Sequence, residues 1–455
     1  MKLADRIFYM LRNSLPSPLS IAILLTIVVF GVTCFTVTPV PNETVLSTVF
    51  NLWEQGVWST GGLVFLVQMM LMLILGHVLA LTNLANQLIN RLVGVTNNPQ
   101  LMVWLVCFAT LLVSWFNWGL GLIFGAIFCR KIGEYAQLHK IKINYALIGA
   151  AGYSGLMFWH GGLSGSALVK VAEQGHLQSL AADKWSGLPS SIGFNETVFS
   201  GANLGVSLII LLVVPFLLMR FGKSNQAIPS GLLVVRNKLK HEQTQFLAEK
   251  LDVANWFGFL IGGGVLLGIV FQFFSSGKGW AFVTPNSINL TLLGLALLLH
   301  GSVKKFSTAL DQAITDGAGI LIQFPLYFGI MGLMSGGNLI EYIANFFVGF
   351  SSTESFPVWA FISAGFVNLF VPSGGGQWMV QGSIIIDACM QLGVPLKKGI
   401  MALAYGDQIT NMLQPFWALP LLGITKLKAQ EILPYTLLIL LVGSVIYLLG
   451  LTLLY

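Results

Sequence analysis

"VPSGGGQW", residues 371–378, interrupts an apolar run that extends from Val358 to Leu392. A second interruption, Phe116-Asn117-Trp118-Gly119, divides the apolar run from Leu101 to Cys129 in the first half of the chain. The arms beside each interruption are shorter than the roughly 20 helical residues that cross a hydrocarbon core. We therefore expect two re-entrant helical hairpins, at about 100–129 and about 358–392, whose tips line a protein or water cavity.

The composition is that of a membrane protein. Of the 455 residues, 55% are hydrophobic and 9% are charged, which excludes a soluble globular protein. The apolar runs are long and do not alternate as the strands of a membrane barrel do, so an all-α polytopic protein is expected. The four cysteines have no metal-ligand spacing, and the excess of basic residues indicates membrane orientation, with no nucleic acid as partner.

The hydropathy pattern predicts about nine full spans in addition to the two hairpins. Their expected ranges are Leu19–Val37, Gly62–Leu81, Tyr145–Val171, Leu204–Met219, Trp256–Phe274, Ile288–His300, Gly317–Met334, Gly399–Ile424 and Pro434–Leu454. The first of these runs lacks a small-residue cleavage site, so it is expected to be a retained helix and not a signal peptide.

Loop charges predict the orientation. Basic residues gather between Arg220 and Lys250, and again at Arg130, Lys131, Lys140 and Lys142 after the first hairpin. The positive-inside rule assigns both segments to the cytoplasm. The segment Pro39–Glu54 has no Lys or Arg and is expected outside. The N-terminus is then expected on the cytoplasmic side of the membrane and the C-terminus on the outer side, although Lys397 and Lys398 also fall on the outer side.

The order helix, helix, hairpin, helix, helix occurs twice. We expect an N-terminal repeat at 1–220, a cytoplasmic linker loop at 221–253, a connecting helix at 254–275 and a C-terminal repeat of inverted topology at 286–455. The linker's Phe246, Leu247 and Leu251 suggest a short interfacial helix within a solvated loop. Paired interrupted segments in two inverted halves indicate the substrate site of a secondary transporter.

The span after each hairpin is itself interrupted. Gly152-Tyr153-Ser154-Gly155 and His160-Gly161-Gly162-Leu163-Ser164-Gly165-Ser166 break the first, and the segment from Gly406 to Pro415 breaks the second. A break in a helix leaves backbone carbonyls without helical partners, and these carbonyls can bind a cation. The helix that starts after the break presents its N-terminus, where an anion can bind.

Asp407 is the main candidate for ion coupling, because a carboxylate inside an apolar span is costly unless it has a function or a partner. It could ligate Na⁺ with nearby carbonyls or carry a proton, and the sequence leaves both open. Asn411 and Ser154 are expected to assist it. No cofactor is expected, and the coupling cation is H⁺ or Na⁺.

The substrate is expected to bind between the hairpin tips, where glycines allow close backbone approach. His160 could donate to an anionic substrate or be a neutral structural histidine. The full set of expected substrate-binding residues is Asn117, Gly119, His160, Ser164, Ser373, Gly374, Gly375, Gly376, Gln377, Thr410, Asn411 and Gln414.

Pro372-Ser373-Gly374-Gly375-Gly376-Gln377-Trp378, with the downstream Gln414-Pro415-Phe416-Trp417, resembles the short-chain fatty acid transporter family typified by the acetoacetate/butyrate carrier AtoE. The resemblance covers essentially the whole chain. It implies uptake of short monocarboxylates, such as butyrate or acetoacetate, across a bacterial inner membrane by cation-coupled symport, and the outer side that the C-terminus faces is then the periplasm. More distantly, the pattern is similar to the ion-transporter clan, which implies an elevator-like transport domain and a possible homodimer.

Two other functions fit parts of the sequence. Re-entrant loops also build the filters of channels, so a monocarboxylate channel or uniporter is one alternative. Gly162-Leu163-Ser164-Gly165 matches the GxSG pattern of intramembrane serine proteases, which need a histidine base on a neighbouring helix. The candidates His176, His241 and His300 fall in loops or at a helix end, so alternating-access transport is favoured over both.

Overall fold

The computed structural model describes the chain except for residues 1–15, 85–86, 88–96, 182–184, 224–248 and 278–281. The described first half contains α2 (Pro18–Thr36), α3 (Val45–Val57), α4 (Thr60–Ala80), α6 (Pro99–Phe116), α7 (Trp118–Leu138), α8 (Tyr145–Tyr153), the 3₁₀ turn η1 (Ser154–Met157), α9 (Ser166–Ala172), α10 (His176–Ala181) and α11 (Gly201–Met219). The short α12 (Glu249–Val253) and the long α13 (Asn255–Ser276) lie between the halves.

The second half contains α14 (Pro285–His300), α15 (Val303–Ala313), η3 (Ile314–Gly317), α16 (Ala318–Gly336), α17 (Leu339–Gly349), α18 (Phe356–Asn368), α19 (Gly374–Leu392), α20 (Leu396–Thr410), η4 (Asn411–Leu413), α21 (Pro415–Thr425) and α22 (Ala429–Leu453). Local signals set several ends. Helix α14 starts with Pro285 behind a Thr284–Ser287 capping box and stops at Gly301, whose φ is 77°.

Seven stretches of the described chain are long and apolar enough to cross a membrane, which agrees with a multi-pass membrane protein. They are Pro18–Thr36, Val45–Leu79, Pro99–Phe116, Gly201–Met219, Asn255–Ser276, Ala318–Gly336 and Ala429–Leu453. The number of nine full spans stays a prediction. The expected interfacial helix at 246–251 lies mostly outside the described residues, which resume at Glu249.

Two expectations from the sequence are wrong. The segment Pro39–Glu54, expected as a loop, contains most of α3. The apolar residues of α3 recur with a helical period, and Val49 and Val57 of this helix are buried. The first hairpin does not end near Cys129 either. Helix α7 runs on to Leu138 and buries Arg130 and Lys131, which were expected in a cytoplasmic loop.

Glu134 explains the longer helix. It accepts hydrogen bonds from Arg130 Nε at 3.0 Å and from Lys131 Nζ at 2.8 Å, so the two cations are paired inside the protein. Helix α6 has 18 residues, α7 has 21 and α19 has 19. The hairpin arms are therefore longer than the sequence suggested, and only α18, with 13 residues, is clearly too short to cross a bilayer.

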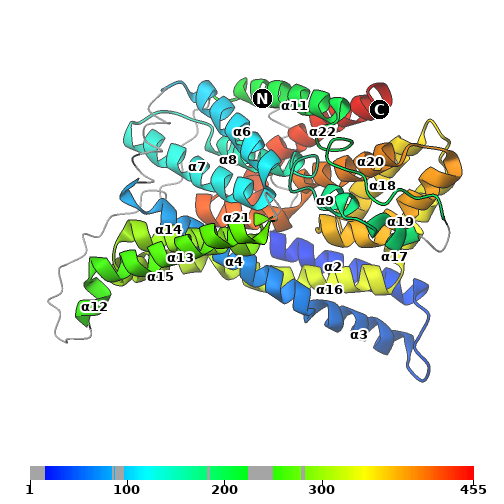
Figure 1. Ribbon diagram of the computed structural model, residues 1–455, viewed down its shortest axis with the longest axis horizontal. Helices are drawn as coiled ribbons and strands as arrows, with labels where there is room; N and C mark the ends of the chain where they lie inside the picture. The colour runs from blue at the N-terminus through cyan, green and yellow to red at the C-terminus, as the bar shows by residue number, and fades with distance from the viewer. Residues whose placement is uncertain (1–15, 85–86, 88–96, 182–184, 224–248, 278–281) are drawn as a thin grey trace.

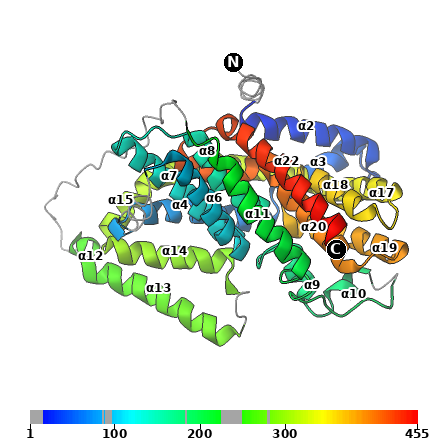
Figure 2. The ribbon, with the colours of Figure 1, turned by 90° about the horizontal axis from the view of Figure 1, so that it is seen from above.

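The helices form two layers (Figure 1). We call the lower layer the frame; it consists of α2, α3, α4, α13, α14, α15 and α16. We call the upper layer the hairpin bundle; it consists of α6–α9 and α18–α21, and α11 and α22 lie beside each other along it (Figure 2). Breaks occur in both layers, between α3 and α4, between α15 and α16, and after α8 and α20.

In the frame, helices of the first half of the chain pack on helices of the second half. Helix α2 of the first half packs on α16 of the second, and α14 of the second half packs on α4 of the first. Likewise α3 packs on α16 and α15 packs on α4. The frame is therefore built from helices of both halves of the chain.

Glycines bring α3 and α16 into direct backbone contact. A Cβ atom on Gly332 would lie 2.5 Å from the carbonyl oxygen of Leu52, and one on Gly56 would lie 2.4 Å from that of Phe328. Because small residues let helices approach closely in the membrane, these glycines hold the frame together.

Gly332→Ala is expected to lower the thermal unfolding midpoint of the detergent-solubilised protein by several degrees. The new methyl group meets backbone that has no room to move, and overpacking of this kind costs about 1–3 kcal/mol. Gly263→Ala is the matched control, because Gly263 lies inside α13 with nothing within 4 Å of its would-be Cβ. An equal midpoint for the wild type and Gly332→Ala would contradict the glycine contact.

Candidate functional site

The two hairpin tips are built alike. Asn117 is the single residue between α6 and α7, and its Oδ1 accepts the backbone N–H of Leu120 at 3.0 Å. Ser373 precedes α19 in the same way, and its Oγ accepts the N–H of Gly376 at 3.1 Å. Each tip residue therefore caps the N-terminus of the second arm. Gly374–Gly376, expected in the turn, form the first turn of α19.

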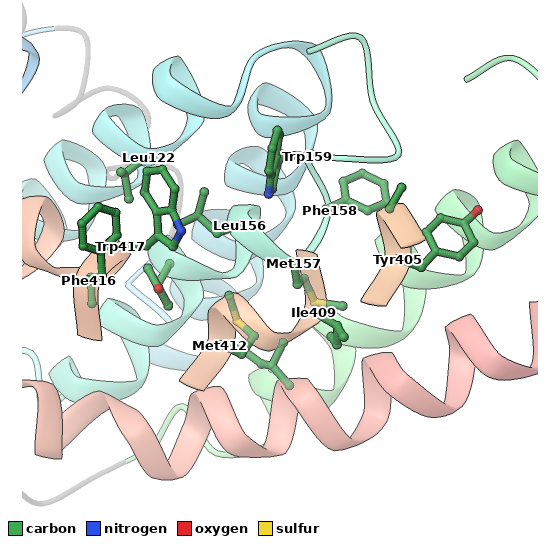
Figure 3. Close-up of a cluster of buried hydrophobic side chains, with 14 of the residues drawn as sticks. Leu122, Leu156, Met157, Phe158, Trp159, Tyr405, Ile409, Met412, Phe416 and Trp417 are labelled. Atoms are coloured by element: carbon green, nitrogen blue, oxygen red, sulfur yellow. The ribbon is translucent and has the colours of Figure 1, made fainter. Parts of the chain in front are cut away.

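Polar side chains satisfy the backbone at both helix breaks. Asn411 Nδ2 donates to the carbonyl of Leu156 at 3.0 Å, and Tyr153 OH donates to the carbonyl of Asn411 at 2.7 Å. These two contacts join the break after α8 to the break after α20. Figure 3 shows Leu156 and Met157 of the first break beside Ile409 and Met412 of the second.

Amide side chains hold α18, the first arm of the second hairpin, against the break after α20. Asn368 Nδ2 lies 2.6 Å from the carbonyl oxygen of Asp407, 3.0 Å from Thr410 Oγ1 and 2.9 Å from Asn411 Oδ1. Gln414 Nε2 donates to the carbonyl of Asn368. Thr410, Asn411 and Gln414 therefore connect the break in α20 to α18.

His160 and Asp407 form a buried pair. Their side chains are 0% and 1% exposed, and His160 Nδ1 lies 2.5 Å from Asp407 Oδ2. The other ring nitrogen, Nε2, accepts the backbone N–H of Ala167 at 3.0 Å. Because Nε2 accepts, the proton of the neutral ring is on Nδ1, which donates to the carboxylate. Both nitrogens of His160 are thus engaged within the protein.

The tip of the second hairpin lies directly on this pair. A Cβ atom on Gly374 would be 2.8 Å from His160 Cε1, 2.8 Å from Trp159 Cη2 and 3.2 Å from Asp407 Oδ2. Only glycine allows the start of α19 to come this close.

A cavity of about 480 Å³ lies between the frame and the hairpin bundle. The frame contributes Gly56, Ser59, Gly61, Gly62 and Phe65 around the break between α3 and α4, and Phe328, Met331, Gly332 and Ser335 from α16. The bundle contributes Trp118, Leu156, Trp159, Ser166, Pro372, Ser373, Gly374, Gly375 and Trp417. None of these residues carries a charge.

Aromatic rings form much of the wall. Trp118 and Trp417 meet edge to face, with ring centroids 5.3 Å apart, and Phe65 lies 5.9 Å from Trp417. Trp159 continues this wall and stacks on His160 with a centroid distance of 4.4 Å. In Figure 3, Trp417 and Trp159 lie on either side of Leu156. The cavity therefore combines an aromatic wall with the serines Ser59, Ser166, Ser335 and Ser373.

Some of the expected site residues line the cavity, and others lie outside its lining. Ser373, Gly374 and Gly375 line it, and His160 and Asp407 lie directly beneath Gly374. Gln377 is buried against the carbonyl of Ala364 and the side chain of Gln381. Ser154 bonds to the carbonyl of Ala151 and to Cys107.

The remaining expected residues lie around the first tip. Gly119 faces Met72 of the frame. Ser164 Oγ accepts the N–H of Trp118 at 2.9 Å, and within the described chain it makes no hydrogen bond to a histidine. The GxSG pattern thus serves here to hold the first tip against the break that follows α8.

Sequence reasoning missed the frame side of the cavity. Gly61-Gly62 and Ser59 do interrupt the apolar run before α4, and this could have marked a further break. Phe65, Phe328 and Met331 carried no such signal, since each is an ordinary apolar residue in an apolar helix. Trp159, beside the expected residue His160, was not singled out, and Ser166 was named only as the last residue of the break that begins at His160.

Comparisons with known proteins agree with the resemblance read from the hairpin sequence. Two curated proteins match, one from Escherichia coli (strain K12) at 34% identity over 448 residues and one from Haemophilus influenzae (strain ATCC 51907 / DSM 11121 / KW20 / Rd) at 34% over 451 residues. Each match covers 96% of both chains, and both proteins bear the name "Putative short-chain fatty acid transporter".

Two solved transporters also match over nearly their full length. One is MtrF of Neisseria gonorrhoeae, described as an antimetabolite efflux pump, with 14% identity, a TM-score of 0.43 and coverage of 98% of this chain and 97% of that one. The other is the YdaH transporter of Alcanivorax borkumensis, with 18% identity, a TM-score of 0.43 and coverage of 96% and 97%. The family model "Short chain fatty acid transporter" matches residues 1–454. The chain, which is a transporter and not an enzyme, belongs to the short-chain fatty acid transporter family.

Proposed function

We propose that this protein moves small monocarboxylates of the butyrate and acetoacetate type across the bacterial inner membrane by cation-coupled symport. The observation that supports this most is the position of the cavity, between the frame and the tips of the hairpin bundle. A volume of about 480 Å³ is in the range of small-molecule sites. Its uncharged lining suits a ligand that has one polar end and a short apolar tail.

The carboxylate end of the substrate would bind at the second tip. Ser373, Gly374 and Gly375 line the cavity at the N-terminus of α19, a helix of 19 residues. Such a terminus offers N–H groups without helical partners and a partial positive charge. Ser166 Oγ faces the same point, since a Cβ on Gly375 would lie 3.8 Å from it.

The tail would lie against the aromatic wall. Phe65, Trp118 and Trp417 come from three different helices and make an apolar surface without charged neighbours in the lining. Burial of each methylene there contributes about 0.8 kcal/mol, so a tail of a few carbons adds measurable affinity.

Alternating access would occur by movement of the hairpin bundle against the frame, in the manner of an elevator. The exchanged contacts of α2 with α16 and of α14 with α4 support two repeats related by a two-fold axis. We take these repeats as inverted, because α13 is an extra apolar helix of spanning length between them. The N-terminus would then be cytoplasmic and the C-terminus periplasmic.

Coupling requires a cation, H⁺ or Na⁺, that binds close to the substrate and offsets its charge. Asp407 supports this role, since it is buried one residue layer behind the cavity at Gly374. A uniporter or channel would need no such carboxylate. The frame, which presents α13 and α14 at one edge, would also provide the contact for a homodimer.

The first expected result is accumulation of radiolabelled butyrate and acetoacetate in proteoliposomes under an imposed proton or sodium gradient. Accumulation beyond that in protein-free liposomes, where the undissociated acid already follows a pH difference, establishes symport, because only coupled transport adds to this passive accumulation. Movement that only equilibrates, at a rate indifferent to both gradients, would contradict symport and favour a channel or uniporter.

The double variant Ser373→Ala, Gly375→Ala is expected to raise the KM for butyrate uptake about tenfold, since it removes a hydroxyl and narrows the approach to the α19 backbone. Ser302→Ala is the matched control. Ser302 caps α15 by accepting the N–H of Lys305, and it lies outside the cavity lining. A KM in the double variant equal to that of the control would remove the second tip from the site.

Met331→Ala is expected to shift substrate preference toward longer acids, because it enlarges the cavity on the frame side. We expect the ratio of kcat/KM for hexanoate to that for butyrate to rise between about threefold and tenfold, as for contacts worth one or two methylenes. Met334→Ala, on the same helix and outside the cavity lining, should leave this ratio unchanged. Equal ratios for both variants would show that Met331 does not contact the tail.

A further inference from the structure

We propose that the coupling ion is a proton, that it binds to Oδ1 of Asp407, and that its binding is linked to that of the substrate through the close approach of Gly374. This proposal rests on the proposed function and specifies its cation. It assigns His160 the role of a positioning residue that donates permanently to Oδ2, instead of a ligand of the substrate.

The hydrogen bonds of His160 exclude the imidazole as the site of proton uptake in this conformation. Its Nδ1–H is shared with Asp407 Oδ2, and its Nε2 lone pair accepts the N–H of Ala167 at 3.0 Å. A second ring proton would need that lone pair and would face a backbone N–H. Stacking on Trp159 and full burial hold the ring in place.

The carboxylate has one oxygen available. Asp407 Oδ1 is buried and has no hydrogen-bond partner among the described residues, whereas Oδ2 accepts from His160. An unpartnered buried carboxylate oxygen is costly as an anion and much less so as an O–H group. Proton uptake therefore forms an O–H bond at Oδ1 with a proton from water, and proton release on the other side of the membrane breaks it. The His160 N–H to Oδ2 bond persists throughout.

No other charge contacts this carboxylate within the described chain. The elements that pack on α20 are α9, α18, α19, α22, η1 and η4. The titratable side chains on these elements and on α20 itself, apart from Asp407, are Lys170, Asp387, Cys389, Lys397, Lys398, Tyr405, Glu431, Tyr435 and Tyr447.

Most of these side chains have contacts of their own elsewhere. Lys170 pairs with Glu173, and Asp387 accepts from Trp185 Nε1. Tyr405 OH donates to Asn203 Oδ1, and Tyr447 OH donates to the carbonyl of Met157. Lys397 and Lys398 lie in the first turn of α20, roughly 15 Å from Asp407 at 1.5 Å per helical residue. His160 is the one titratable partner of Asp407 that the described structure shows.

Proximity links the two binding events. Gly374 lines the cavity, and a methyl group on it would lie only 3.2 Å from Asp407 Oδ2. A substrate carboxylate at this tip would therefore face the anionic form of Asp407 across a thin, water-poor layer, where like charges repel strongly. The protonated acid removes this repulsion, so substrate binds best to the protonated protein and the proton binds best to the loaded one.

The test measures binding of radiolabelled butyrate to the purified full-length protein between about pH 6 and pH 8, where a simple carboxylic acid is almost wholly ionised. For the wild type, affinity is expected to rise by up to about tenfold for each unit that the pH falls, the limit for one linked proton. In weak buffer, a pH indicator should report uptake of one proton for each butyrate bound. Replacement of sodium by choline should change neither result.

Variants test whether Asp407 or another titratable residue binds the proton. Asp407→Asn should bind butyrate without proton uptake and with an affinity that no longer depends on pH. Asp387→Asn, a carboxylate of the same type on α19 and away from the cavity, should retain the wild-type pH dependence. If Asp407→Asn fails to fold, the indicator measurement on the wild type still decides the nature of the ion.

Three results would overturn the proposal. One is butyrate binding that requires sodium and takes up no proton. Another is unchanged proton uptake in Asp407→Asn. The third is loss of proton uptake in His160→Gln while Asp407→Asn retains it, which would place the proton on the imidazole. Failure of the wild type to bind any short monocarboxylate at any pH is a distinct result, and it would reject the proposed function itself.

Discussion

The site depends on one constraint: backbone groups that leave a helix inside an apolar bundle must find hydrogen-bond partners there. Two helix breaks occur within the hairpin bundle, and at each of them amide or phenol side chains form hydrogen bonds with the backbone. Asn411 reaches Leu156, Tyr153 reaches Asn411, and Gln408 Oε1 accepts the N–H groups of His160 and Gly161 at 2.7 and 3.2 Å. These contacts run between the halves of the chain, so each half completes the broken helix of the other.

The sequence was most informative where the backbone is unusual. Clustered glycine and proline weaken a helix, so inside an apolar run they mark a turn or a close backbone approach, and both hairpin tips fall at such stretches. Asp407 could be singled out because a lone acid in such a setting is rare. Its partner could not be named, since His160 and Asp407 lie 247 positions apart in the sequence and no local pattern links them.

Other features escaped prediction for physical reasons. Arg130 and Lys131 suggested a loop, because a count of charges does not reveal that Glu134, one helical turn away, forms an ion pair with each of them. The amphipathic helix α3 was not predicted, because its polar residues Asn51, Glu54 and Gln55 made the segment look like a loop. These residues lie on the more exposed side of the helix. The frame wall of the cavity uses residues such as Phe328, whose role follows only from which helices cross. Polar residues at the breaks suggested ligands, whereas the structure uses several of them to satisfy backbone.

The glycine contacts have a consequence for motion. Within the bundle, Cβ atoms on Gly125 and Gly406 would lie 2.1 Å from the carbonyl oxygens of Gly152 and Phe361, so hairpin arms and broken helices touch through their backbones. The frame is joined in the same way at Gly56 and Gly332. Between the two layers the contacts are made by side chains, among them the rings of Phe324 and Phe416, which stack with centroids 4.0 Å apart. If the hairpin bundle moves against the frame as proposed, it would slide along this boundary, where the cavity lies, because the close backbone contacts within each layer resist such a movement.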